Sequence, residues 1–152
     1  MPTEEIFTSP YKFGVNGIVY SSKPLVYNGS LIEDFYLEFK DGAVINFDAK
    51  VGKEILRQII EYDENSKYLG EVALVDYDSP ISKSNLIFYE TLYDENAACH
   101  LALGSSYLEC IKEPNFDIVN KSNTHVDFMI GTKDLEVIAD DEIIMKDGNF
   151  IK

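Results

Sequence analysis

The sequence predicts an α+β domain built mainly from antiparallel strands, with few helices. Apolar and polar residues alternate on both sides of an Asp41-Gly42 pair, over residues 35–39 and 43–47. An Asp-Gly pair between two alternating runs is a strong signal for a β-hairpin. A second such pair, Asp147-Gly148, follows a short apolar run near the end of the chain. Because turns this short join antiparallel neighbours, antiparallel pairing is expected to dominate.

A chain of 152 residues has the length of a single domain, and residues 1–152 are expected to form one. Its first ten residues are expected to form an entering loop. Strands are then predicted over residues 15–20 and 25–27, which glycine, proline and an Asn-Gly pair separate.

The clearest helix follows the hairpin. From Val51 to Ile60, apolar side chains recur at three- and four-residue spacing, with charged residues on the other side. This is the pattern of an amphipathic helix that buries one face. Asp48 or Asn46 is available to cap its N-terminus.

The second half of the chain is predicted to hold one short helix among strands. Asp94 precedes the run from Glu95 to Leu103, and Gly104 ends it, which predicts a capped helix. Asp78-Ser79-Pro80 predicts a turn. The remaining strands are expected over residues 69–76, 85–92, 125–130, 135–139 and 142–145.

The charge balance excludes some classes of partner. The chain holds 27 acidic and 13 basic residues, a formal charge of −14. Nucleic acid and anionic membranes are not expected to bind it, because lysine and arginine provide most of their affinity. Cations and ammonium groups suit the chain better. The alternative is that the acidity only keeps the protein soluble, and charge alone favours this alternative.

Cysteine usage and the N-terminus favour a soluble protein of the cytoplasm. Cys99 and Cys110 lie among apolar neighbours and form no CxxC pair, so buried free thiols in a reducing compartment are expected. The N-terminus is acidic and lacks the apolar stretch of a signal peptide, and no run approaches 18 apolar residues.

His125 and Asp127 form the first candidate metal pair. They are two residues apart in a predicted strand, so both side chains project from one face. An imidazole nitrogen and a carboxylate oxygen placed in this way can bind one divalent ion or two adjacent ions. The alternative is a surface strand whose polar residues face water.

Glu71 interrupts an otherwise apolar strand, residues 69–75. A carboxylate removed from water needs a cation, a metal ion or an exposed strand face, because burying it alone is costly. An edge strand with a wet face would explain Glu71 without a metal.

Glu95 and His100 flank the start of the predicted second helix. Residues five apart on a helix point about 140° away from each other, so these two would not share one face. An acid that favours the helix dipole and a half-buried histidine would explain them without a metal. Glu4 and Glu5, judged by spacing alone, are two solvated acids. The sequence contains no P-loop, GxGxxG, HExxH or GxSxG pattern.

Four segments carry a family resemblance: MPTEEIFT at residues 1–8, YLGEVALV at 68–75, YETLYDENAACHLALG at 89–104 and NTHVDFMIG at 123–131. Together and in this order they resemble the M29 family of metallopeptidases, the thermophilic-type aminopeptidases. The resemblance implies removal of N-terminal residues from peptides by a water activated by two divalent ions, Zn²⁺, Co²⁺ or Mn²⁺. It also implies a homodimer, and a larger N-terminal α/β domain that this C-terminal metal-binding portion lacks.

The resemblance also implies roles for individual residues. Tyr107 matches an active-site tyrosine that would donate a hydrogen bond to the oxyanion. Glu71, or else Glu4 or Glu5, would act as general base. Two alternatives stay open: a metal-binding or dimerisation module that is inactive without its N-terminal domain, and an acidic interaction domain with no metal. The positions that match metal ligands are Glu5, Glu71 (shared between the two ions), Glu95, His100, His125 and Asp127.

Overall fold

The computed structural model describes residues 4–84, 95–112 and 118–151. These residues form two four-stranded sheets and one three-stranded sheet, and all of the paired strands are antiparallel. The predicted α+β class, mainly antiparallel with few helices, is confirmed. Within the described ranges, no helix is long and apolar enough to cross a membrane.

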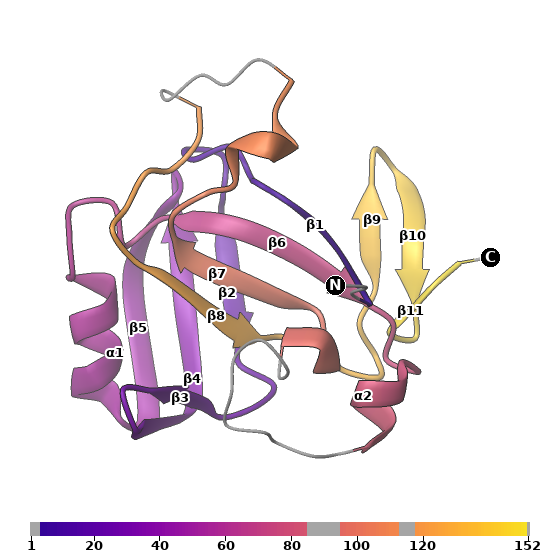
Figure 1. Ribbon diagram of the computed structural model, residues 1–152, viewed down its shortest axis with the longest axis horizontal. Helices are drawn as coiled ribbons and strands as arrows, with labels where there is room; N and C mark the ends of the chain where they lie inside the picture. Colours follow the sequence, from indigo (N-terminus) through magenta and orange to yellow (C-terminus); the bar gives the residue numbers. More distant parts are fainter. Residues whose placement is uncertain (1–3, 85–94, 113–117, 152) are drawn as a thin grey trace.

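The first sheet has the strand order β1-β6-β7-β8, so β6 and β7 are its central strands and β1 and β8 its edges. In Figure 1, β6, β7 and β8 run across the strands of the second sheet. The four strands are β1 (Glu5–Thr8), β6 (Leu69–Val75), β7 (His100–Gly104) and β8 (His125–Met129).

The second sheet is organised around one long strand, β4, which pairs with three others. The predicted hairpin joins β4 to β5. Asp41 and Gly42 both have positive φ, 50° and 85°, as a two-residue hairpin turn requires. The strands of this sheet are β2 (Gly17–Tyr20), β3 (Leu25–Tyr27), β4 (Ser30–Lys40) and β5 (Ala43–Val51).

Helix α1 (Lys53–Ile60) follows β5 directly and flanks it in Figure 1. The predicted cap is wrong, because Asp48 and Asn46 still belong to β5. Gly52 is the N-cap residue, with φ 77° and no side-chain cap hydrogen bond. Asp48 instead forms an ion pair with Lys53, with 3.0 Å between Oδ1 and Nζ.

The hydrophobic core lies between the two large sheets and α1. Phe35 of β4 and Phe128 of β8 meet there, with 5.6 Å between their ring centroids. One face of the first sheet is therefore committed to apolar packing, and polar side chains on its strands must use the other face. The buried cluster comprises Ile32, Phe35, Leu37, Phe39, Leu56, Ile59, Ile60, Leu69, Leu103, Val126 and Phe128.

The third sheet stands at the opposite end of the molecule from α1 (Figure 1). It consists of β9 (Val137–Ala139), β10 (Glu142–Lys146) and β11 (Asn149–Phe150). The predicted turn at Asp147-Gly148 joins the last two strands, with φ of 51° and 74°. The short helix α2 (Pro80–Ser84) begins at the proline of the predicted turn.

Two predicted elements are wrong. Residues 5–8 form the edge strand β1, and the helix predicted from Glu95 to Leu103 is a 3₁₀ turn, η1 (Glu95–Ala97), followed by strand β7. A segment this short has little helical stability of its own, and pairing with strands on both sides outweighs it. The strand predicted over residues 85–92 and the cap at Asp94 lie outside the described residues.

The cysteine prediction holds for one residue of the two. Cys99 is a buried free thiol, whereas Cys110, in the 3₁₀ turn η2 (Leu108–Cys110), is only half-buried.

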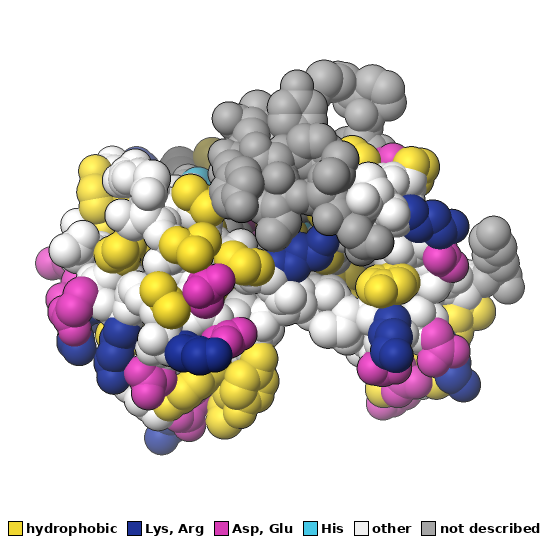
Figure 2. Space-filling view, turned by 90° about the horizontal axis from the view of Figure 1, so that it is seen from below, with side chains coloured by type: hydrophobic (Ala, Val, Ile, Leu, Met, Phe, Trp, Pro, Cys, Tyr) yellow, Lys and Arg dark blue, Asp and Glu magenta, His cyan; other side chains and the backbone are white. Residues whose placement is uncertain are grey.

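Charged side chains of both signs are interspersed on the face of the molecule in Figure 2. Lys50 pairs with Asp34 at 3.4 Å, and Lys83 with Asp78 at the same distance. Exposed pairs of this kind contribute about 0–1 kcal/mol each to the stability of the fold. They compensate the chain's negative charge only locally.

Candidate metal centre

The candidate ligands gather on the face of the first sheet that points away from the hydrophobic core. Glu71 pairs with Ala102, and Ala102 pairs with Asp127, so these three positions form one row across the sheet. Directly paired residues point to the same face, and residues two apart in a strand share it. By this register, five of the six candidates share the face: Glu5, Glu71, His100, His125 and Asp127.

A β-bulge at Gly70 puts Glu71 on that face. Leu69 pairs with Leu103 but Glu71 pairs with Ala102, so β6 contains one extra residue between them. In a regular strand, Glu71 would face the same side as Leu69, which lies in the hydrophobic core. Gly70 lies so close to the carbonyl oxygens of Gly104 and Ser105 that a Cβ would collide with both.

The alternative of a wet edge strand at Glu71 is therefore wrong. Strand β6 is central, and the Glu71 residue is only 4% exposed. One signal in the sequence points to the bulge: a lone glycine inside a strand pattern, directly before the acid.

Glu71, His125 and Asp127 form a compact cluster whose ligand atoms all lie within 4.8 Å of one another. His125 Nε2 lies 3.0 Å from Glu71 Oε2 and 3.2 Å from Asp127 Oδ1. Its Nδ1 lies 2.8 Å from the Ser105 carbonyl oxygen, which can only accept a hydrogen bond. Burial alone would lower the pKa of His125, but hydrogen bonds to Asp127 and Glu71 outweigh it and raise the pKa to about 10.

His100 and Glu5 form a second pair on the same face. His100 is 1% exposed, and its Nε2 lies 3.4 Å from Glu5 Oε2. Its Nδ1 lies 3.1 Å from the Ala98 carbonyl oxygen. The helical geometry expected to separate His100 from Glu95 does not apply, since His100 begins a strand and Glu95 belongs to the turn before it.

Glu95 and Tyr107 lie in the electric field of the same acids. Burial, followed by the charges of Glu5, Asp127 and Glu71, raises the pKa of Glu95 to about 7. Burial, followed by the charges of neighbouring carboxylates, raises the pKa of Tyr107 to about 12.

Aromatic contacts hold the Tyr107 ring beside the cluster of Glu71, His125 and Asp127. It meets the His125 ring edge-on, with 5.2 Å between the centroids, and contacts Phe7 of β1 at the same separation. Its backbone N–H donates to Ser9 Oγ at 2.9 Å. Because its pKa is raised, Tyr107 retains its phenolic proton in this position next to the candidate ligands. Glu4, by contrast, is exposed.

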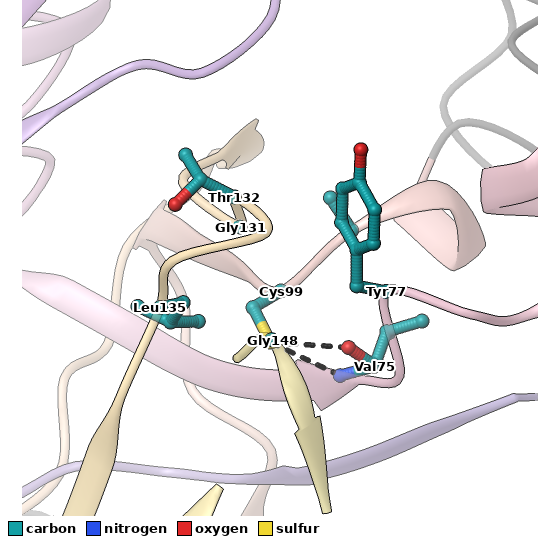
Figure 3. Close-up of a pocket in the computed structure, with 8 residues that line it drawn as sticks. Val75, Tyr77, Cys99, Gly131, Thr132, Leu135 and Gly148 are labelled. Atoms are coloured by element: carbon teal, nitrogen blue, oxygen red, sulfur yellow. Dashed lines mark hydrogen bonds between the residues drawn. The ribbon is translucent and has the colours of Figure 1, made fainter. Parts of the chain in front are cut away.

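Cys99 joins β6 to β7 beyond the end of their ladder (Figure 3). Its thiol accepts a hydrogen bond from the Val75 N–H at 3.2 Å and donates to the Val75 carbonyl at 3.3 Å. Burial raises the pKa of this thiol, so the donor proton is retained. Because Val75 pairs with Glu5 and Cys99 precedes His100, the thiol fixes the backbone that carries the second pair.

Two kinds of contact in this site, carbonyl–imidazole and thiol–backbone, leave no trace in the sequence. The carbonyls of Ala98 and Ser105, which hold the two imidazole rings, could come from any residue type. The thiol of Cys99 was expected to be buried, but its bonds to Val75 follow only from the fold.

Comparison with known proteins places the chain in a family. The sequence profile of the thermophilic metalloproteases, M29, matches residues 1–150. The chain belongs to this family. The resemblance expected from the four segments is therefore confirmed.

Two curated relatives are about half identical to this chain. Aminopeptidase AmpS of Bacillus subtilis (strain 168) is 50% identical over 167 aligned residues, which cover 99% of this chain and 40% of that protein. Aminopeptidase 2 of Geobacillus stearothermophilus is 51% identical over 156 residues, covering 97% and 37%.

A solved M29 structure has the same fold. Wild-type AmpT from Thermus thermophilus superposes with a TM-score of 0.93 at 39% sequence identity, over 99% of this chain and 40% of that one. The chain thus spans about 40% of the length of the first relatives that it matches.

The donor set of this M29 chain suits divalent metal ions. The set contains four carboxylates and two imidazoles, and burial followed by the repulsion of Glu5, Asp127 and Glu71 raises the pKa of Glu95. Bound cations would relieve that repulsion. Imidazole together with carboxylate is the ligand combination of Zn²⁺, Co²⁺ and related ions.

Proposed function

We propose that this chain is the metal-binding portion of a metal-dependent aminopeptidase, which removes N-terminal residues from peptides with two divalent ions. The observation that carries the proposal is the convergence of five candidate ligands on one sheet face, around the cluster of Glu71, His125 and Asp127. The names of the relatives, all of them aminopeptidases, supply the reaction.

Six residues are proposed to hold the ions. The compact cluster supplies one imidazole and two carboxylates, and the His100–Glu5 pair with Glu95 supplies another imidazole and two more. Glu71 is the proposed carboxylate shared between the ions. The six proposed ligands are Glu5, Glu71, Glu95, His100, His125 and Asp127.

Two bound ions would supply Lewis acidity toward the scissile carbonyl and a water of lowered pKa. Tyr107 is proposed to donate its phenolic hydrogen bond to the developing oxyanion, because its raised pKa keeps the proton in place. Glu71 is the proposed general base, with Glu4 or Glu5 as the alternative. The surrounding acids would attract the ammonium group of the substrate's N-terminus.

The second candidate function is a metal-binding or dimerisation module that needs a preceding domain for turnover. The observation that favours it is length, since the chain covers only about 40% of its aminopeptidase relatives. Homodimerisation and a cytoplasmic location stay predictions.

Metal titration tests the proposal first. The purified chain is expected to bind Co²⁺ or Zn²⁺. Glu71→Gln is expected to lower the affinity for one or both ions. A wild-type chain that binds no ion throughout the titration would contradict both the aminopeptidase and the metal-binding module. Hydrolysis of an amino-acyl chromogenic substrate by the metal-loaded chain would then separate the aminopeptidase from the inactive module.

A further inference from the structure

Asn120 has a buried side chain in the loop that leads into β8. The residue is 2% exposed, and its Nδ2 lies 2.6 Å from the Gly104 carbonyl oxygen and 2.8 Å from that of Asn65. The Tyr68 carbonyl oxygen lies 3.4 Å from the same nitrogen. Carbonyl oxygens only accept hydrogen bonds, so the amide nitrogen rather than the amide oxygen must face them.

The Asn120 side chain thus ties together two segments that enter the metal centre. Asn65 and Tyr68 lie just before β6, which carries Glu71, whereas Gly104 is the last residue of β7. The Gly104 N–H also donates to the Tyr68 carbonyl at 2.9 Å. The amide therefore fixes the end of β7 against the start of β6.

The backbone of Asn120 holds the next residues of the chain after β7. Ser106 N–H donates to the Asn120 carbonyl at 3.0 Å, and Asn120 N–H donates to Ser106 Oγ at 3.1 Å. Between these anchors, Ser105 N–H donates to the Thr124 carbonyl at 2.8 Å. Ser105 is therefore held on both sides, by Gly104 and by Ser106.

Ser105 matters because its carbonyl oxygen lies 2.8 Å from His125 Nδ1. A hydrogen bond from Nδ1 fixes the orientation of the ring and leaves Nε2 directed at Glu71 and Asp127. Outer contacts of this kind orient metal-binding histidines and tune their affinity for the ion.

We propose that Asn120 is a positioning residue that fixes the Ser105 carbonyl and thereby aims His125 Nε2 at Glu71 and Asp127. The inference deepens the proposed metal site and rests on it for the statement that His125 binds an ion. The orientation of the ring itself does not depend on a metal.

The two histidines provide an internal control. The His100 ring is held by the Ala98 carbonyl, before β7, at the end of that strand away from Asn120. A defect that acts through Ser105 should therefore alter His125 and spare His100. General loss of stability should affect both rings together.

The experiment compares Asn120→Ala with wild type and with Ile59→Ala, a core substitution in α1. The first readout is the pair of imidazole N–H proton signals in the NMR spectrum of the metal-free chain, assigned through His100→Gln and His125→Gln. The second is Co²⁺ affinity with the visible spectrum of the Co²⁺-loaded chain. Asn120→Ser, which retains one hydrogen-bond donor, replaces Asn120→Ala if the alanine variant does not fold.

The expected result is selective. The His125 N–H signal should shift or broaden, the His100 signal should persist, and Co²⁺ affinity should fall about tenfold or more. Ile59→Ala should keep both signals and the wild-type Co²⁺ spectrum. Unchanged His125 signal and Co²⁺ affinity in the folded Asn120 variant would overturn the proposal, as would equal loss of both histidine signals. If wild type binds no Co²⁺, the metal function fails, and the NMR signals alone decide the role of Asn120.

Discussion

The two histidines of the site are held in the same way but in different surroundings. Each ring meets a backbone carbonyl through Nδ1 and a carboxylate through Nε2. His125 has two carboxylate neighbours, from the central strand β6 and its own strand, whereas His100 meets Glu5 from the edge strand β1. The His125 half combines the central strand β6 with the edge strand β8, and two of its three members, His125 and Asp127, share one strand. The His100 half depends on how firmly a four-residue edge strand stays docked.

This contrast is tested most strongly by removing one imidazole at a time. His125→Gln takes the only nitrogen from the compact cluster and should weaken Co²⁺ binding about 100-fold or more, beyond the effect typical of an outer contact. His100→Gln should leave one ion bound with nearly wild-type affinity. Isothermal titration calorimetry gives stoichiometry and affinity for both. Equal losses in the two variants would mean that the site does not divide into halves.

Removing the Cys99 thiol should loosen the backbone behind the His100 half. Cys99→Ala leaves the buried Val75 N–H and carbonyl without their thiol partner, at a cost of about 2 kcal/mol. Cys99→Ser retains a hydroxyl and should lose less. Urea unfolding measures both changes. A stability of Cys99→Ala equal to wild type would show that these sulfur contacts contribute nothing.

Disturbing β1 should affect the His100 half and spare the other. Val75 directs its N–H and carbonyl to Cys99, away from β1, so by alternation Ile6–Leu74 and Thr8–Val72 are the pairs that exchange hydrogen bonds between β1 and β6. Ile6→Pro removes the Ile6 N–H donor. It should lower the affinity for the ion at the His100–Glu5 pair about tenfold, roughly the effect of one lost hydrogen bond.

The matched control for this variant is Ile6→Ala. The Ile6 side chain is 65% exposed, so its truncation should leave both ions in place. If the two substitutions act alike on Co²⁺ stoichiometry, the backbone of β1 is not what holds Glu5.

The smallest effect concerns the loop before His125. Asp63 accepts hydrogen bonds from Ser122 Oγ and Asn123 N–H, both at 2.8 Å. Burial opposes its ionisation, but these bonds and that from Asn65 lower the pKa to about 2 from 3.8. A lowered folded-state pKa stabilises the protein above the unfolded value, so this contribution is complete above about pH 4 and disappears as pH falls toward 2.

Asp63→Asn should therefore remove about 1 kcal/mol at neutral pH, after allowance for solvent screening. It should also flatten the decline in stability between pH 4 and 2. Thermal melts across this range check both statements. An acid limb of unchanged steepness would contradict the assigned role of Asp63.

Local patterns predicted those parts of the fold that local physics decides. The Asp41-Gly42 hairpin, the amphipathic helix near residues 53–60 and the apolar strand around Glu71 all formed as expected. The run from Glu95 to Gly104 was predicted wrongly, because its strand exists only through pairing with β6 and β8.

The candidate site divides in the same way. His125 and Asp127 were placed on one face from their spacing, and the structure puts them 3.2 Å apart. Glu5 and Glu95 had no local signal and depended on family resemblance. The convergence of Glu5 with His100 follows from register across three strands, which is a long-range property that a single sequence does not display.

The bulge at Gly70 also bears on how the chain reaches its native state. If β6 paired without the extra residue, Glu71 would lie among Leu69 and Leu103, where an ionised carboxylate is strongly disfavoured. A one-residue slip in a strand exchanges its two faces, so this penalty separates the correct strand pairing from its nearest competitor. The penalty on the misaligned pairing needs no bound ion, so Glu71→Leu is expected to increase misaligned, aggregation-prone species during refolding, which light scattering would detect.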